Sequence, residues 1–173
     1  MSAPLTFGIA ANAKHADCAA YFLHWVATNE TAREFDVLFQ GVGKPEVFLY
    51  ASHYLSGFLN EKPLAQLRQD LAQLGLGRDD TTMSDTEDHL AFVLEVMRFL
   101  VAGEDVSISN LTQQSRFFAA HVQTWVPALC DALAAHPQAR FYAVLSALFA
   151  VACLLLWVRL APQRRAVPVQ TEG

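Results

Sequence analysis

The sequence predicts an all-α protein, a single-domain bundle of six or seven helices. Apolar residues recur at helical spacing along most of the 173 residues, and no segment alternates apolar and polar residues for the length of a strand. Prolines and glycines stand where such helices would begin and end. Apolar residues make up 53% of the chain and charged residues 17%, which is enough for one core and excludes a disordered chain.

The first half of the chain is expected to hold four helices, each bounded by a helix breaker. Pro45 and Pro63 suit first turns, because the fixed φ and the missing N–H of proline cost nothing there. Gly75 suits a C-terminus, since glycine readily adopts the positive φ with which many helices end. The four helices are expected at residues 15–28, 31–40, 45–59 and 63–75.

Three longer helices are expected after a polar loop at residues 75–83. Ser84 and Glu87 fit a capping box, in which each side chain accepts a hydrogen bond from the backbone N–H of the other. Pro127 should bend or step the second of these helices, and Pro162 should stop the third. The helices are expected at residues 84–102, 110–134 and 137–160, so residues 1–161 form the helical domain and residues 162–173 a flexible C-terminal tail.

The helix expected at residues 84–102 carries the first candidate site. On such a helix Asp88 and Glu95 lie about 20° apart, and with Arg98 they form a polar stripe that has His89 at its edge. The helix dipole favours acids at an N-terminus, so capping alone explains many of them. Alternatively, Asp88 and His89 present an acceptor and a titratable donor to a ligand. The acids around this N-terminus are Asp79, Asp80, Asp85, Glu87 and Asp88.

A second candidate lies on the following helix. Phe117, His121 and Trp125 are four residues apart and therefore share one face. A histidine in such a row is usually a hydrogen-bonded core residue, and aromatic residues belong to the core more often than to a ligand platform. A small hydrolase that uses His121 or His89 is the enzyme alternative.

Few patterns point to an enzyme or a cofactor. The chain has no Gly-x-Ser-x-Gly nucleophile motif, and the segment Gly41–Pro45 is too short for a phosphate-binding loop. His15 and Cys18 would share a helical face, but they lack the second Cys/His pair of a metal site. We therefore expect no catalysis, no bound metal and no cofactor.

The charge distribution excludes nucleic acid as a partner and suits a basic one. Residues 1–158 carry nine basic and 16 acidic side chains, whereas nucleic-acid binding requires neutralisation of phosphates. An acidic body attracts a basic peptide over long range. Cys18, Cys130 and Cys153 are scattered, as reduced thiols of a cytosolic protein are, and the N-terminus lacks the pattern of a secretory signal.

The run Phe141–Val158 contains Ser146 as its one polar residue. Its length reaches the lower limit for a membrane span, so the alternative from another class is a tail-anchored membrane protein with a helical cytosolic head. Its alanines lower its hydropathy, and we favour a helix buried in the bundle over one inserted in a membrane. The residues expected to face inward are Phe141, Leu145, Leu148, Ala152 and Leu155.

Five segments between residues 30 and 158 carry a further pattern. The segment Glu87-Asp88-His89-Leu90-Ala91, followed by Glu95-Val96-Met97, resembles the Asp-His signature of the TorD/DmsD family, whose members are cytoplasmic chaperones for molybdenum-cofactor oxidoreductases. The other segments resemble that family's elements in the right order; they are Glu34-Phe35-Asp36-Val37-Leu38-Phe39-Gln40-Gly41, Tyr50-Ala51-Ser52-His53-Tyr54, residues 117–125 and Phe141-Tyr142.

The resemblance implies an all-helical chaperone. Family members bind the twin-arginine signal peptide, or another part, of an apo-molybdoenzyme catalytic subunit, and they delay its export until the cofactor is inserted. The family's Asp-His pair is tied to signal-peptide recognition, which implies that role for Asp88 and His89. Asp85 and Glu87 are then expected to join them in binding the two arginines through charge-assisted hydrogen bonds. Tyr50, Tyr54 and Phe58 are expected to share one helical row and to line the groove. The other residues expected in the site are His121 and Trp125.

Two features depart from the family pattern. The chain begins late, because family members usually carry more helix ahead of the segment at residues 34–41. The last helix is more apolar than the pattern suggests. Either change would leave apolar surface exposed, and a homodimer, with helices swapped between copies as is known in the family, would cover it.

Overall fold

The computed structural model describes residues 29–41, 44–59, 61–78 and 85–164. Within these ranges the chain forms seven α-helices and one π-helix and no strand, which confirms the all-α prediction. The elements are α2 (Asn29–Phe35), the π-helix η1 (Asp36–Gln40), α3 (Ala51–Ser56), α4 (Lys62–Gln73), α5 (Leu90–Ala102), α6 (Leu111–His121), α7 (Val126–Ala135) and α8 (Phe141–Arg164). The helix expected at residues 15–28, most of the loop at 75–83 and most of the tail at 162–173 lie outside the described residues.

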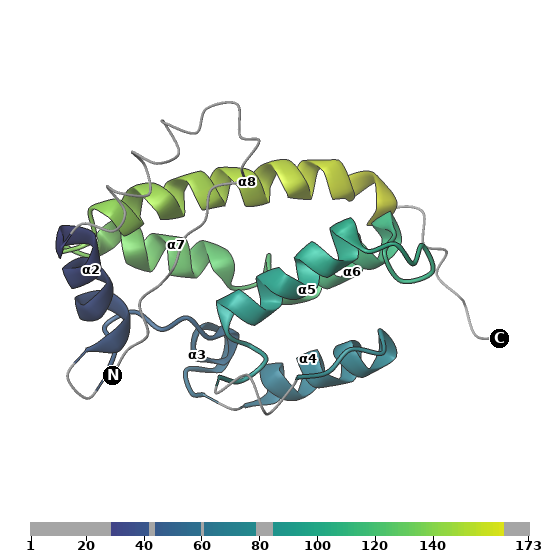
Figure 1. Cartoon of the computed structure of the whole chain (residues 1–173), viewed down its shortest axis with the longest axis horizontal. Coiled ribbons are helices and arrows are strands. Elements are labelled where there is room, and N and C mark those ends of the chain that lie inside the picture. Colours follow the sequence, from purple (N-terminus) through teal and green to yellow (C-terminus); the bar gives the residue numbers. More distant parts are fainter. Residues whose placement is uncertain (1–28, 42–43, 60, 79–84, 165–173) are drawn as a thin grey trace.

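The helices lie in layers around one core. Figure 1 shows α8 along one side of the molecule, α7 and α6 next to it, and α3 and α4 on the opposite side. The core residues at the centre come from several elements and are almost completely buried; among them are Leu38, Val93, Leu100, Phe118, Trp125 and Leu129. The indole N–H of Trp125 donates to the carbonyl oxygen of His121 at 2.7 Å, so this large side chain is buried with its polar atom satisfied.

Helix α4 begins and ends as predicted. Pro63 lies in its first turn, and Gly75 follows its last residues with a φ of 69°. The N–H of Leu76 donates to the carbonyl of Leu71 at 2.9 Å, and the N–H of Gly75 donates to that of Ala72 at 3.1 Å. This pair of bonds is a Schellman motif, which requires the left-handed conformation that glycine adopts at little cost.

The prediction of a helix at residues 45–59 was wrong. Only α3 is helical, and the chain before it pairs with two distant segments. The N–H of Val47 donates to the carbonyl of Leu38 at 2.9 Å, and the N–H of Leu90 donates to that of Leu49 at 2.8 Å. Because these backbone groups are bonded to other segments and not within a helix, Pro45 does not begin one.

The predicted start of α5 at Ser84 was also wrong, because the helix begins at Leu90. His89 is its N-cap residue, and the imidazole Nδ1 accepts a hydrogen bond from the N–H of Ala91 at 3.2 Å. Asp88 therefore precedes the helix and does not share a stripe with Glu95, which forms an exposed ion pair with Arg98.

The long helix expected at residues 110–134 is divided in two. Asn110 caps α6 by accepting a hydrogen bond from the N–H of Gln113 at 3.0 Å. The helix ends at His121, and α7 begins at Val126 with Pro127 in its first turn. The step predicted at Pro127 is thus confirmed, and it spans the four residues before α7.

Helix α8 differs from its prediction in its start, its end and its orientation. It begins after the turn that contains Pro137, and it continues past Pro162, which removes one backbone hydrogen bond without ending the helix. Four of the five residues expected to face inward are exposed: Leu145, Leu148, Ala152 and Leu155. The residues that face the core or the neighbouring helices are Tyr142, Ser146, Phe149, Cys153, Leu156 and Leu160.

The outer face of α8 is apolar and open to solvent. Leu148 is 65% exposed and Leu155 is 66% exposed, although both lie in a long apolar helix. Residues 141–161 are long and apolar enough to cross a membrane by length and composition, but the inner face of the same helix packs on α6 and α7. The prediction of a buried helix therefore holds for one face and fails for the other.

The start of α8 is fixed by a side chain from α2. The carboxylate of Glu34 accepts hydrogen bonds from three successive backbone N–H groups: Arg140 at 2.9 Å, Phe141 at 3.1 Å and Tyr142 at 2.8 Å. A carboxylate at this position satisfies donors that have no partner within the helix, and it also complements the helix dipole.

Replacement of Glu34 by alanine should lower the free energy of unfolding by about 1–2 kcal/mol, because three N–H groups lose a charged acceptor. Urea unfolding followed by circular dichroism measures this change. Glu104→Ala, which removes an exposed acid beyond the end of α5, is the control and should change stability by less than about 0.5 kcal/mol. Equal effects of the two variants would show that Glu34 does not cap α8.

Candidate functional site

The predicted site residues gather around one turn, residues 85–89, which we call the acidic turn. It precedes α5 and lies against the N-terminus of α3, where Tyr50 and His89 form an isolated antiparallel bridge. The hydroxyl of Tyr50 donates to Oδ1 of Asp85 at 2.6 Å, and its ring meets the imidazole of His89 edge-on, with the centroids 5.0 Å apart. Burial, then the hydrogen bond to Asp85, raises the pKa of Tyr50, so its hydroxyl remains a donor.

Asp88 fastens the acidic turn to α3. Its Oδ2 accepts a hydrogen bond from the N–H of Ser52 at 3.0 Å, and its Oδ1 accepts one from the hydroxyl of Thr86 at 2.6 Å. Its backbone carbonyl accepts a third from the N–H of Ala51 at 3.0 Å. The residue is 1% exposed, so both carboxylate oxygens serve the fold and the charge lies beneath the surface.

His89 connects the acidic turn to α5. The Nδ1 atom that accepts from Ala91 must be unprotonated, which assigns the ring proton of the neutral form to Nε2. Burial lowers the pKa of His89, while the charges of Asp85 and Asp88 partly oppose that shift. The cap and the lowered pKa both favour the neutral imidazole.

Glu87 forms an ion pair with a residue that the sequence analysis did not identify. Arg68 of α4 donates from Nε to Oε1 at 3.0 Å and from Nη2 to Oε2 at 2.9 Å. Burial raises the pKa of Glu87, but the hydrogen bonds from Arg68, a backbone hydrogen bond and the charges of Arg68 and Arg78 together outweigh it, so the net pKa is lowered. The capping box expected between Ser84 and Glu87 lies partly outside the described residues, and its Glu87 half is replaced by this ion pair.

A surface cavity of about 320 Å³ lies behind the acidic turn, among α3, α4, α5, α6 and the start of α7. Asp88, His121 and Trp125 contribute to its wall, so residues predicted from two separate segments meet at one cavity. Most of the other lining side chains are apolar, among them Leu55 and Leu67. A concave apolar wall with a few polar groups is typical of a binding site.

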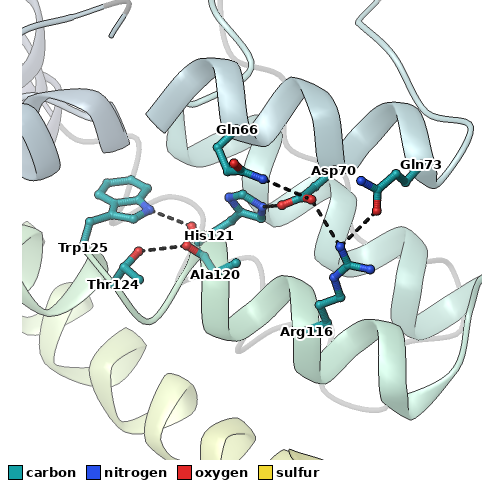
Figure 2. A network of polar contacts seen from close by, with 8 residues as sticks. All are labelled: Gln66, Asp70, Gln73, Arg116, Ala120, His121, Thr124 and Trp125. Atoms are coloured by element: carbon teal, nitrogen blue, oxygen red, sulfur yellow. Dashed lines mark hydrogen bonds and ion pairs between the residues drawn. The ribbon is translucent and has the colours of Figure 1, made fainter. Parts of the chain in front are cut away.

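His121 is held in place by α4. Figure 2 shows its imidazole directed toward Asp70, with 2.7 Å between Nε2 and Oδ2, and Arg116 reaching the same region. Arg116 donates to Gln73 at 3.0 Å and lies 3.5 Å from the other oxygen of Asp70. Burial lowers the pKa of His121, whereas Asp70 raises it in part. His121 is thus a buried, hydrogen-bonded residue, as is usual for a histidine in an apolar helical row. It also borders the cavity.

The three aromatic residues expected to share a helical row have different environments. Tyr50 is the N-cap residue of α3, Tyr54 lies within the helix, and Phe58 follows Gly57, whose φ of 80° ends it. Tyr54 stacks on Trp125 with the ring centroids 5.8 Å apart, and its hydroxyl donates to a backbone carbonyl. Phe58 is 72% exposed. The prediction that these three side chains share one helical row was wrong, because α3 ends at Ser56 and is too short to contain all of them.

Four residues of this region were not predicted from the sequence as members of the site. Arg68 and Asp70 lie on α4 beside the buried leucines, and no spacing rule links them to partners 19 and 51 residues away. Leu55 and Leu59 are exposed apolar residues close to Phe58 in the sequence, and we group the three as one exposed apolar patch. The expected helical row of aromatic residues did not include the two leucines.

The arrangement suits binding and gives little support to catalysis. Within the described ranges, no group of three or more His, Cys, Asp or Glu residues is placed to hold a metal ion. His89 and His121 each take part in a structural hydrogen bond. Cys130 and Cys153 are free thiols, as expected, whereas His15 and Cys18 lie outside the described part of the chain.

Comparisons with known proteins agree with these features. A family model described as the nitrate reductase delta subunit matches residues 12–131. Chaperone protein TorD of Vibrio cholerae is 32% identical over 109 residues, which are 59% of this chain and 49% of that protein. Chaperone protein TorD of Vibrio parahaemolyticus is 25% identical over 134 residues, 73% of this chain and 62% of that one. No solved structure matches. The chain spans about half the length of the first of these relatives.

Replacement of Asp88 by alanine should destabilise the protein by about 2 kcal/mol, because the buried N–H of Ser52 loses its acceptor and the acidic turn loses its attachment to α3. Urea unfolding measures the change. Asp131→Ala removes an exposed acid of α7 and serves as the control. A loss no greater than that of the control would show that Asp88 does not hold α3.

The His89 cap should make stability depend on pH. Because the folded state lowers the pKa of His89, its contribution is complete above the ordinary histidine value of about 6.5 and is lost as the pH falls below it. His89→Asn keeps an N-cap acceptor and removes this titration. Unfolding free energies measured between about pH 7.5 and pH 5.5 should therefore fall more in the unmodified protein than in the variant. Parallel curves would exclude His89 as the cause.

Proposed function

Because the chain belongs to the nitrate reductase delta subunit family, in which the TorD chaperones fall, we propose that it is a cytoplasmic chaperone for a molybdenum-cofactor oxidoreductase. It binds the twin-arginine signal peptide, or another part, of the apo-form catalytic subunit. Binding assists cofactor insertion and delays export of the client. This role requires neither catalysis nor a cofactor of its own.

The observation that carries this proposal is an acidic turn next to an apolar surface. Asp85 is exposed, and Glu87 lies two residues further along the same turn. Leu55, Phe58 and Leu59 form the exposed apolar patch at the end of α3, which begins at the acidic turn. A signal peptide has two arginines followed by an apolar stretch, so its charged part matches the acidic turn and its apolar part matches the patch.

The residues of the site have separate roles in this proposal. Asp85 and Glu87 bind guanidinium groups through charge-assisted hydrogen bonds. Asp88 and His89 hold the acidic turn between α3 and α5, so they act by placing Asp85 and Glu87. Tyr50 orients the carboxylate of Asp85.

The apolar part of the client packs on the exposed patch and the cavity behind the acidic turn. Phe58 supplies exposed apolar surface, and Tyr54 stacks on Trp125, which lines the cavity. His121 and Trp125 border the cavity, where they restrict its size and polarity. An apolar surface of this kind adds affinity with little sequence specificity.

The tail-anchored alternative is supported by the length and apolar outer face of α8. It is less favourable, because withdrawal of α8 into a membrane would expose the core residues that pack on α6 and α7. The expectation of a homodimer, with or without swapped helices, stays a prediction, and the outer face of α8 is the surface that such a dimer would bury.

Binding of a labelled twin-arginine signal peptide, followed by fluorescence anisotropy, tests the proposal. Asp85→Asn should weaken binding about tenfold, because a charge-assisted hydrogen bond contributes roughly 1.5 kcal/mol. Glu95→Gln also removes one acidic charge from an exposed site, outside the acidic turn, and should leave the affinity within about twofold. A signal peptide with two lysines should bind more weakly than the arginine peptide.

The double variant Asp88→Ala/His89→Ala tests the supporting residues. It should bind the peptide more weakly at a temperature where circular dichroism shows it to be folded. Unaltered affinity would exclude the acidic turn as the site. A protein that binds none of the candidate signal peptides would contradict the proposed function as a whole.

A further inference from the structure

Two arginines of the chain itself contact the acidic turn. Arg68 forms two hydrogen bonds to the carboxylate of Glu87, and Arg78 donates from Nη1 to the backbone carbonyl of Asp85 at 2.9 Å. The side chain of Arg68 is 52% exposed, whereas that of Glu87 is 10% exposed. The carboxylate is therefore largely covered, and Arg68 provides a solvent-facing part of the cover.

This contact has the geometry that a bound arginine would need. Two parallel N–H···O bonds between a guanidinium and a carboxylate are the most specific way in which a protein recognises arginine. Building on the proposed function, we propose that Arg68 is an internal competitor. It occupies the guanidinium site of Glu87 in the client-free protein and gives way to an arginine of the client.

The exchange costs little free energy. The side chain of Arg68 is half exposed on α4, so its guanidinium is already partly hydrated while it pairs with Glu87. Glu87 is mostly buried, and a buried carboxylate without a partner is costly. Replacement of one guanidinium by another keeps this carboxylate paired throughout, while Arg68 is hydrated in solvent.

The same exchange selects arginine over lysine. A lysine ammonium is a point charge and cannot restore both parallel bonds to Glu87 after Arg68 leaves. A lysine client that displaced Arg68 would therefore form fewer hydrogen bonds to Glu87 than Arg68 did, whereas an arginine client would restore both of them. Arg68 in this role is a specificity-determining residue.

Arg78 has a different role, because it contacts the backbone of the acidic turn. Its hydrogen bond to the carbonyl of Asp85 leaves the carboxylate of that residue to Tyr50. Arg78 thus supports the conformation of the turn, and its charge also acts on Glu87, whereas the two bonds from Arg68 to that carboxylate are the ones that a client arginine would replace.

Signal-peptide affinity in Arg68 variants tests the inference. Arg68→Gln should bind the twin-arginine peptide about two- to fivefold more tightly, since no internal pair must be displaced. Arg98→Gln is the matched control, because it removes the same charge from another bidentate pair, the fully exposed one with Glu95. Arg68→Lys keeps the net charge and should show an intermediate gain. The preference for arginine over lysine peptides should fall in Arg68→Gln.

An affinity of Arg68→Gln equal to or weaker than that of Arg98→Gln would overturn the inference. A second measurement follows the arginine Nε–H resonances in the unmodified protein. Addition of the twin-arginine peptide should shift the Arg68 signal and speed its exchange with water, and an unchanged signal at saturation would also overturn the inference.

A client-free measurement separates this inference from the proposed function. Low millimolar methylguanidinium should raise the melting temperature of Arg68→Ala by filling the vacated site, and it should leave Arg98→Ala and the unmodified protein unchanged. Stabilisation of Arg68→Ala alone would support an exchangeable guanidinium site even if no signal peptide bound, in which case only the proposed function would fail. No stabilisation would overturn the inference, even if signal peptides bind.

Discussion

The buried carboxylate of Asp88 at the start of α3 is the interaction on which the site depends. It joins two segments 36 residues apart in the sequence, and its backbone carbonyl adds a second connection at the same point. With α3 held there, Tyr50 meets Asp85 and Tyr54 reaches Trp125. A residue whose charge is hidden in this way shapes the proposed binding surface by holding its parts together.

Helix boundaries could be predicted from the sequence where the backbone groups at the helix end bond to residues close by in the chain. Gly75 and Asn110 end and begin helices through bonds within a few residues, so their sequence context was sufficient. Residues 44–50 and the start of α5 depend instead on bonds to each other and to η1, which no periodicity reveals. The orientation of α8 was equally hidden, because a helix that is apolar on all sides has no preferred face.

The residues of the candidate site were proposed from the sequence, but their places in the structure could not be predicted from it. Asp88 and His89 were identified as neighbours on a helix that presents them to a ligand, and in the structure both stabilise the ends of helices. The partners of Glu87 and His121 come from α4, in a segment whose polar residues resemble an ordinary solvated face. Tertiary pairing of this kind becomes visible only when the helices are placed together.

The cap of α8 by Glu34 bears on the order in which the protein folds. The carboxylate and the N–H groups that it binds are 106 to 108 residues apart, so nearly the whole chain must be synthesised before the contact can form. Contacts of such high sequence separation are costly in loop-closure entropy and slow folding. Of the helices that the structure describes, the apolar α8 is made last, which leaves the surfaces of α6 and α7 uncovered until then. A protein with this topology is itself vulnerable to aggregation during its synthesis.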